Sequence, residues 1–181
     1  MEGQGLSRKG NTVQMQYLKN FLLLFSVGVL FLTVSCNPDR IFEENQTIPE
    51  STWDKDNILY FTTEMKDTSV AYNVYLNIRN AGIYPFSNIF LFITTTKPDG
   101  TTARDTAEFT LADADGRWLG SGMGDIWDNQ VLFKRNMHFR QMGKYKFGLE
   151  QAMRVNPLPG IMDMGVRIEL AKVKPAKVKQ P

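Results

Sequence analysis

In YNVYLNIR, residues 72–79, apolar and mostly polar side chains alternate more clearly than elsewhere in the chain. One set is apolar and the other mostly polar: Tyr72, Val74, Leu76 and Ile78 against Asn73, Tyr75, Asn77 and Arg79. Successive side chains of a β-strand point to opposite faces of a sheet, so a period of two predicts a half-buried antiparallel strand.

The same period recurs on both sides of this segment and predicts strands within 58–63, 87–96, 102–111, 131–139, 143–149 and 164–170. Turn signals separate them, the clearest being KPDG at 97–100, where Pro presets the turn backbone and Gly completes it. With about seven strands and no long helical period, the predicted fold is all-β, a two-sheet antiparallel β-sandwich. Both an immunoglobulin-like and a jelly-roll-like arrangement fit, and residues 143–149 are similar to the tyrosine-bearing strand of immunoglobulin-like domains.

Two features interrupt this pattern. Asp105 occupies an inward position, and we expect it to lie near an edge or to pair locally with an arginine such as Arg79. The segment from Ala112 to Asn129 contains four glycines and is expected to be long and irregular.

The N-terminal part contains the apolar run FLLLFSVGVLFLTVSC, residues 21–36, with Lys19 just before it. Its length fits a signal-peptide core and is short for a spanning helix of about 20 residues. The run ends in a small residue followed by Cys36, which resembles the lipobox of a bacterial lipoprotein. We therefore interpret 1–35 as a signal peptide, with Met15 as an alternative start, and Cys36 as the site of cleavage and lipidation by chains such as palmitate.

The mature chain divides into three parts. Residues 36–51 are polar and are interpreted as the lipidated cysteine and a tether, although Ile41 and Phe42 could form a short first strand. Residues 52–171 are the predicted β-sandwich domain. Residues 172–181 repeat lysine and proline without core residues and are interpreted as a disordered basic tail.

Composition narrows the function. The full chain has 21 Lys+Arg and 19 Asp+Glu. It therefore lacks the excess of basic charge that a nucleic-acid-binding protein needs. Cys36 is its only cysteine, which leaves no thiol for a disulfide or a thiolate metal site once it carries lipid.

Residues that could support catalysis or metal binding are few. The glycine-rich segment 116–125 matches neither a P-loop nor a dinucleotide fingerprint. DADG at 113–116 resembles half of a calcium loop, but the other ligand positions are not filled. His138 is the sole histidine and has no nucleophile-elbow motif to serve. We expect no enzyme activity, no metal and no cofactor.

Binding is the better prediction. Five aromatic residues fall in or beside expected loops: Trp53, Tyr84, Phe86, Trp118 and Trp127. Aromatic side chains in such places can anchor a protein partner or stack on a sugar ring. The alternative is that they cap the core, as Trp118 would by plugging the end of the sandwich.

Several motifs, taken together, resemble the GldH family of gliding-motility lipoproteins. They are the lipobox at Cys36, RN at 79–80 followed by YPFSN at 84–88, GRWLGSG at 116–122, GKY at 143–145, and MR at 153–154 before LPGI at 158–161. The resemblance implies a lipid-anchored protein of a Gram-negative envelope, most naturally the outer membrane. It also implies a non-catalytic role in gliding and the associated protein-secretion machinery through other envelope proteins. A glycan-binding module on the same anchor is the alternative that the aromatic residues leave open.

Overall fold

The computed structural model describes residues 15, 17–20 and 38–172. Residues 15 and 17–20 are helical, and residues 38–172 belong to a separate compact unit. No helix in these described ranges combines the length and apolar character needed to cross a membrane. The predictions for the signal peptide, for Cys36 and for residues 173–181 of the basic tail fall on positions outside the described residues, apart from the short helical piece.

The compact unit is built from strands, with one 3-10 turn η1 (Pro49–Ser51). The strands are β1 (Arg40–Thr47), β2 (Thr52–Trp53), β3 (Leu59–Met65), β4 (Tyr72–Ala81), β5 (Asn88–Thr96), β6 (Thr102–Thr110), β7 (Ser121–Met123), β8 (Ile126–Met137), β9 (Gly143–Gln151), β10 (Leu158–Pro159) and β11 (Ile161–Leu170). The described residues thus contain eleven strands, which corrects the expected seven. Three of the extra strands are pairs or triplets of residues too short to give a period-two signal.

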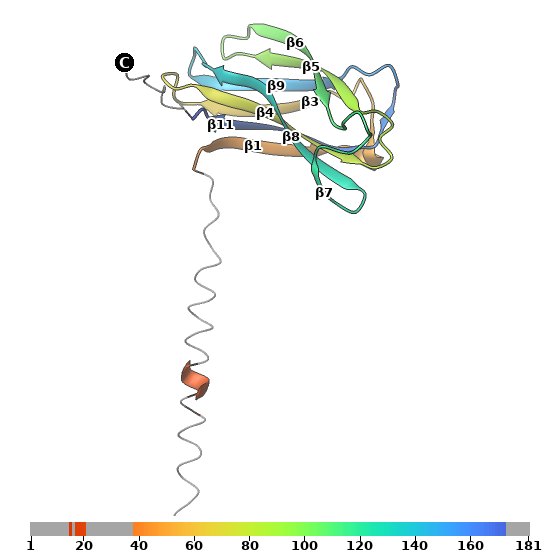
Figure 1. Cartoon of the computed structure of the whole chain (residues 1–181). Coiled ribbons are helices and arrows are strands. Elements are labelled where there is room, and N and C mark those ends of the chain that lie inside the picture. Colours follow the sequence, from red (N-terminus) through yellow and green to blue (C-terminus); the bar gives the residue numbers. More distant parts are fainter. Residues whose placement is uncertain (1–14, 16, 21–37, 173–181) are drawn as a thin grey trace, which may run out of the picture. The chain divides into compact units, whose positions relative to one another are not determined.

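The long strands form two packed sheets, which confirms the antiparallel sandwich (Figure 1). One sheet has the order β1-β11-β4-β8-β7 and the other β3-β9-β5-β6. Ignoring the short strands, the first long strand pairs with the last, the second with the seventh, the third with the sixth and the fourth with the fifth. This nested pairing is that of a jelly roll rather than of an immunoglobulin domain.

The core lies between the sheets, where alternate side chains of most of the long strands are buried. In β4 these are Tyr72, Val74, Leu76 and Ile78, as the sequence predicts, and β3, β5, β9 and β11 contribute in the same way. Each fully buried large apolar side chain contributes roughly 1.5–3 kcal/mol. The hydrophobic effect of this single core therefore holds the two sheets together.

The segment interpreted as a tether contains β1, so the sandwich begins at Arg40 rather than at residue 52. β1 pairs with β11 from Arg40 to Thr47, and Phe42 and Ile48 pack on the core. Apart from the exposed Ile41, its other side chains are polar, as expected for an edge strand with one face in solvent. This polar composition favours a tether in the sequence, whereas the structure shows the alternative, a first strand that includes Ile41 and Phe42.

One further expectation is corrected, and another is met in part. The glycine-rich segment 112–129 contains a hairpin, in which β7 pairs with the start of β8 around Gly124 at φ +64. Asp105 forms an ion pair with Lys134 (2.8 Å), whereas Arg79 pairs with Asp128 and Asp163. Asp105 lies on edge strand β6, so its position near an edge is as predicted.

The sandwich has two ends with different surroundings. At the proximal end, where the described domain begins, the Leu170 amide donates to the Asp39 carbonyl (2.8 Å) and Lys172 pairs with Asp39 (2.9 Å). β4 starts there at Tyr72 and runs the length of the sandwich to Ala81 at the distal end (Figure 1). At about 3.3 Å per residue, the ten residues of β4 separate the two ends by about 30 Å.

Candidate functional site

Four of the five aromatic residues singled out in the sequence meet at the distal end. Tyr84 contacts Phe86 with ring centroids 5.7 Å apart and Trp118 at 6.3 Å, and Trp118 lies 5.3 Å from Trp127. They come from the β4–β5 turn, the segment before β7, and β8. Aromatic pairs at such distances add about 0.5–1.5 kcal/mol each beyond their buried area.

Backbone contacts bring these turns together. The Gly82 amide donates to the Asp125 carbonyl (2.8 Å), which joins the turn after β4 to the β7–β8 hairpin. A Cβ at Gly160, where φ is +85, would come within 2.7 Å of the Tyr84 amide nitrogen. Glycine is therefore required at 160 both for its backbone conformation and for close packing.

Exposed apolar side chains come from the same turns and hairpin as the aromatic cluster. Ile83 is 73% exposed, Leu119 59% and Met123 90%, and Ile126 lies beside Met123 at the hairpin. We call these four residues the distal patch. The sequence analysis missed them because single exposed aliphatic residues give no periodic signal, and only folding places their turns side by side.

Two of the predicted binding aromatics are instead part of the core. Trp53 has no exposed surface, and its indole donates to the Asn57 carbonyl (2.8 Å). Tyr84 is 3% exposed, its hydroxyl donates to the Asn88 carbonyl (2.8 Å), and burial raises its pKa above the ordinary range. Phe86, Trp118 and Trp127 are partly buried, so Trp118 closes the end of the sandwich as one of the two alternatives predicted.

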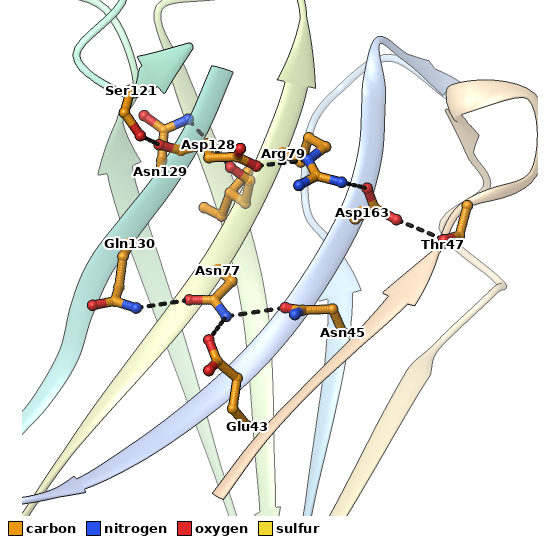
Figure 2. A pocket seen from close by; sticks show the side chains of 11 residues that line it. Glu43, Asn45, Thr47, Asn77, Arg79, Ser121, Asp128, Asn129, Gln130 and Asp163 are labelled. Carbon is orange, nitrogen blue, oxygen red and sulfur yellow. Dashed lines mark hydrogen bonds and ion pairs between the residues drawn. The ribbon is translucent and has the colours of Figure 1, made fainter. Parts of the chain in front are cut away.

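A polar cleft of about 410 Å³ lies on the outer face of the five-stranded sheet (Figure 2). Its lining residues come from β1, β4, β7, β8 and β11: Glu43, Asn45, Thr47, Asn77, Ile78, Arg79, Ser121, Asp128, Asn129, Gln130 and Asp163. The Arg79 guanidinium holds Asp128 at 2.6 Å and Asp163 at 3.1 Å, and the hydrogen bond with Asp128 is the main cause that raises the Arg79 pKa.

Asn77 is the centre of a second polar row in the cleft. Its amide nitrogen donates to Glu43 (2.9 Å) and Asn45 (3.0 Å), and its oxygen accepts from Gln130 (3.3 Å), as Figure 2 shows. Burial raises the pKa of Glu43, but hydrogen bonds from Asn77 and Arg40 outweigh it, so the net pKa lies below the ordinary value.

Gly165 on β11 lies between Asn45 and Asn77 of this row. It is paired with both Asn45 and Asn77, and a Cβ there would overlap the Asn45 side-chain oxygen. Glycine inside a strand commonly marks the close approach of a ligand or of another chain segment. Here it lets Asn45 reach across β11 to Asn77.

The structure offers little for catalysis. His138 is exposed, and among the described residues it has no hydrogen bond to a carboxylate. Nor do the described ranges contain three potential His, Cys, Asp or Glu metal ligands close together. The DADG segment instead forms a closed turn, in which the Asp113 carboxylate accepts the Arg117 amide (2.9 Å) and pairs with its guanidinium (2.9 Å).

The fold and these surfaces define a jelly-roll domain, preceded in the sequence by a segment that resembles a lipoprotein export signal. The model of the GldH lipoprotein family matches residues 40–168, most of the described domain. The chain belongs to this family of gliding-motility lipoproteins, which confirms the resemblance found in the sequence.

Two relatives resemble the chain over most of its length. The gliding motility lipoprotein GldH homolog of Christiangramia forsetii is 36% identical over 156 residues, covering 80% of this chain and 95% of the relative. The gliding motility lipoprotein GldH of Flavobacterium johnsoniae is 35% identical over 159 residues, covering 84% of this chain and 97% of the relative.

Solved structures give only a distant likeness. The VP2 subviral particle of infectious bursal disease virus is 12% identical with a TM-score of 0.30, and the T13 particle of that virus is 12% identical with a TM-score of 0.33. The match covers 94% of this chain but 37% and 35% of the viral chains, so this chain spans about a third of their length. TM-scores this low do not establish a shared fold or function.

Proposed function

We propose that the chain is an outer-membrane lipoprotein, anchored by lipid on Cys36, that supports gliding and the associated secretion machinery by binding other envelope proteins. The role is non-catalytic. Membership of the GldH family supports the lipoprotein and gliding parts of this proposal. The distal patch supports the binding part.

The distal patch has the composition of a protein-binding surface. Its side chains are apolar, and its centre is the partly buried pair Trp118 and Trp127. Contiguous exposed apolar surface on a soluble domain usually marks an interaction site, and aromatic residues are enriched at the energetic centres of interfaces. The adjacent strand β7 is an edge strand of three residues, whose free side can also accept a partner strand.

Its position suits a partner beyond the membrane surface. The patch lies at the distal end, about 30 Å along β4 from the end that follows Cys36 in the sequence. An envelope protein can therefore reach it without displacing the lipid anchor.

The test is photo-cross-linking in cells that make the full-length protein. A photoreactive residue at Met123 is expected to give discrete protein adducts, and Met123→Asp with Leu119→Asp is expected to impair gliding while the protein stays folded and membrane-bound. Met142→Asp is the matched control, because Met142 is also exposed (68%) but does not belong to the distal patch. Equal effects of the two sets of changes on gliding and adduct yield would refute the proposal.

Lipidation is tested separately. Cys36→Ala is expected to release the protein from washed membranes and to abolish fatty-acid labelling, because several acyl chains on this one residue supply the membrane affinity. Retention of an unlabelled native protein in washed membranes would exclude the anchor without bearing on the distal patch.

The polar cleft favours one alternative, a glycan-binding module. Its amide, carboxylate and guanidinium groups can exchange hydrogen bonds with sugar hydroxyls, whereas Trp118 and Trp127 are engaged with each other. Binding of N-acetylglucosamine tetramer that is lost in both Asn45→Ala and Gln130→Ala, but retained in Thr62→Ala on the other sheet, would support this alternative. If glycan binding is lost only in Trp118→Ala or Trp127→Ala, the glycan site lies at the distal end instead of in the polar cleft.

A further inference from the structure

A second cavity, of about 490 Å³, opens at the proximal end between the two sheets. Its walls come from β5, β6, the end of β8, residues 138–141 and β9. The ion pair between Lys134 on β8 and Asp105 on β6 crosses from one sheet to the other in its lining. The volume falls within the range of about 300–1,000 Å³ typical of small-molecule sites.

Contacts place this cavity beside the start of the domain. Asp39 accepts the Leu170 amide, and the Ala171 amide donates to Ala71 (2.9 Å), next to Tyr72. The Tyr72 ring contacts Phe139 with centroids 5.4 Å apart, and Phe139 lines the cavity. Cys36 precedes Asp39 by three residues, and three residues span at most about 11 Å when extended. Lipid on Cys36 would therefore hold this end of the domain near the bilayer surface.

The lining combines an apolar interior with a basic rim. The apolar members are Ala103, Phe133, Met137 and Phe139, and the basic members are Lys97, Lys134, His138 and Arg140. Asp105 is the one acid in the lining and is paired with Lys134. Among the described residues, Arg140 has no ion pair, so its charge is available to an anionic ligand.

One lining residue has an unmet hydrogen-bonding requirement. The Gln141 amide nitrogen donates to Asp99 (2.8 Å), which fixes the orientation of the amide. Its oxygen is buried and has no hydrogen-bond partner among the described residues. Leaving such an acceptor unpaired is unfavourable, and a hydroxyl group on a ligand would satisfy it.

We propose that this cavity binds an anionic phospholipid of the membrane that holds the anchor. The apolar walls take part of an acyl chain, Lys97 and Arg140 lie at the phosphate, and Gln141 accepts a headgroup hydroxyl. The inference rests on the proposed anchoring at Cys36. It adds a specific lipid contact that orients the domain, which lipid on Cys36 alone would not do.

The test uses the full-length lipoprotein in vesicles of phosphatidylethanolamine with a minor fraction of phosphatidylglycerol bearing a diazirine on one acyl chain. Irradiation is expected to label peptides that contain the cavity walls, 95–105 and 131–141. Arg140→Glu is expected to lower the labelling about tenfold, since it reverses a charge beside the phosphate. Arg135→Glu is the matched control, because Arg135 is also exposed and lies on β8, five residues before Arg140, but does not line the cavity.

Ala103→Trp tests whether a chain enters. Ala103 is exposed in the lining, so a bulky side chain can fill the cavity without disturbing the core. We expect cavity labelling to fall while membrane retention stays unchanged. Equal losses in Arg135→Glu and Arg140→Glu, or undiminished labelling in Ala103→Trp, would overturn the proposal. Release of every variant from the vesicles would instead refute the Cys36 anchor, and protein adducts at Met123 report on the distal patch alone.

Discussion

Aromatic rings close both ends of the sandwich, but the rings at the two ends are buried to different extents. At the distal end Trp118 and Trp127 pack on each other while partly exposed, and apolar turn residues surround them. At the proximal end Phe139 is 1% exposed and lies between Tyr72 and Tyr145, leaving a basic cavity beside it. The distal end thus presents apolar surface outward, whereas the proximal end encloses it behind charged groups. This contrast suits a protein partner at one end and lipid at the other.

The largest expected effect is the loss of unfolding free energy when one ring is removed from each aromatic cluster. Phe139→Ala is expected to lower the free energy of unfolding by about 3–5 kcal/mol, because it leaves a cavity in a fully buried site. Trp127→Ala is expected to cost about 1–2 kcal/mol, because its ring is partly exposed. Urea unfolding with unchanged m-values measures both. Equal costs would mean that the distal cluster is as deeply packed as the proximal one.

Glycines with the same backbone conformation at opposite ends separate packing from backbone strain. Gly160 and Gly100 have φ of +85 and +84, but a Cβ at Gly160 would meet the Tyr84 backbone, whereas a Cβ at Gly100 meets nothing within 4 Å. Gly100→Ala is expected to cost about 1–2 kcal/mol from the left-handed conformation alone. Gly160→Ala is expected to cost about 2 kcal/mol more through overpacking. Thermal unfolding of the two variants gives the difference, and its absence would show that the distal turn adjusts freely.

The smallest effect is the acid sensitivity of the proximal turn. Hydrogen bonds from the Thr101 hydroxyl and then the Gln141 amide lower the pKa of Asp99 from 3.8 to about 2. Since the folded state binds the proton less tightly than the unfolded state, this stabilisation is present above pH 3.8 and is lost as the pH falls through 2. Asp99→Asn is therefore expected to flatten the dependence of Tm on pH in this window. Thr101→Val should do so in part, and parallel curves for all three proteins would contradict the assignment.

The sequence predicted the sandwich because alternation is a local property. In β4, the buried residues from Tyr72 to Ile78 are the apolar set that the period of two separates from the mostly polar one. The sequence favoured a tether over a first strand at Ile41 and Phe42, because an edge strand with a solvated face carries polar residues such as Glu43 and Asn45. It missed β7 because three residues are too few to show a period of two. It also could not choose between an immunoglobulin and a jelly-roll order, since pairings such as β1 with β11 join residues more than a hundred positions apart.

The candidate sites were predictable only in part, for the same reason. The sequence places these aromatic residues in or beside loops, but whether each is a surface or a core residue depends on the turns that cover it: Trp53 is enclosed, and Trp127 is partly exposed. The sequence by itself determined the lone cysteine, the apolar face of β4 and the family, whereas the export segment stays a prediction. Only the tertiary structure brought Ile83 beside the β7–β8 hairpin, joined Asn45 to Asn77 across Gly165, and set Arg140 on an apolar cavity. Each of these is a contact between residues distant in sequence, which the long-range pairing of the strands creates.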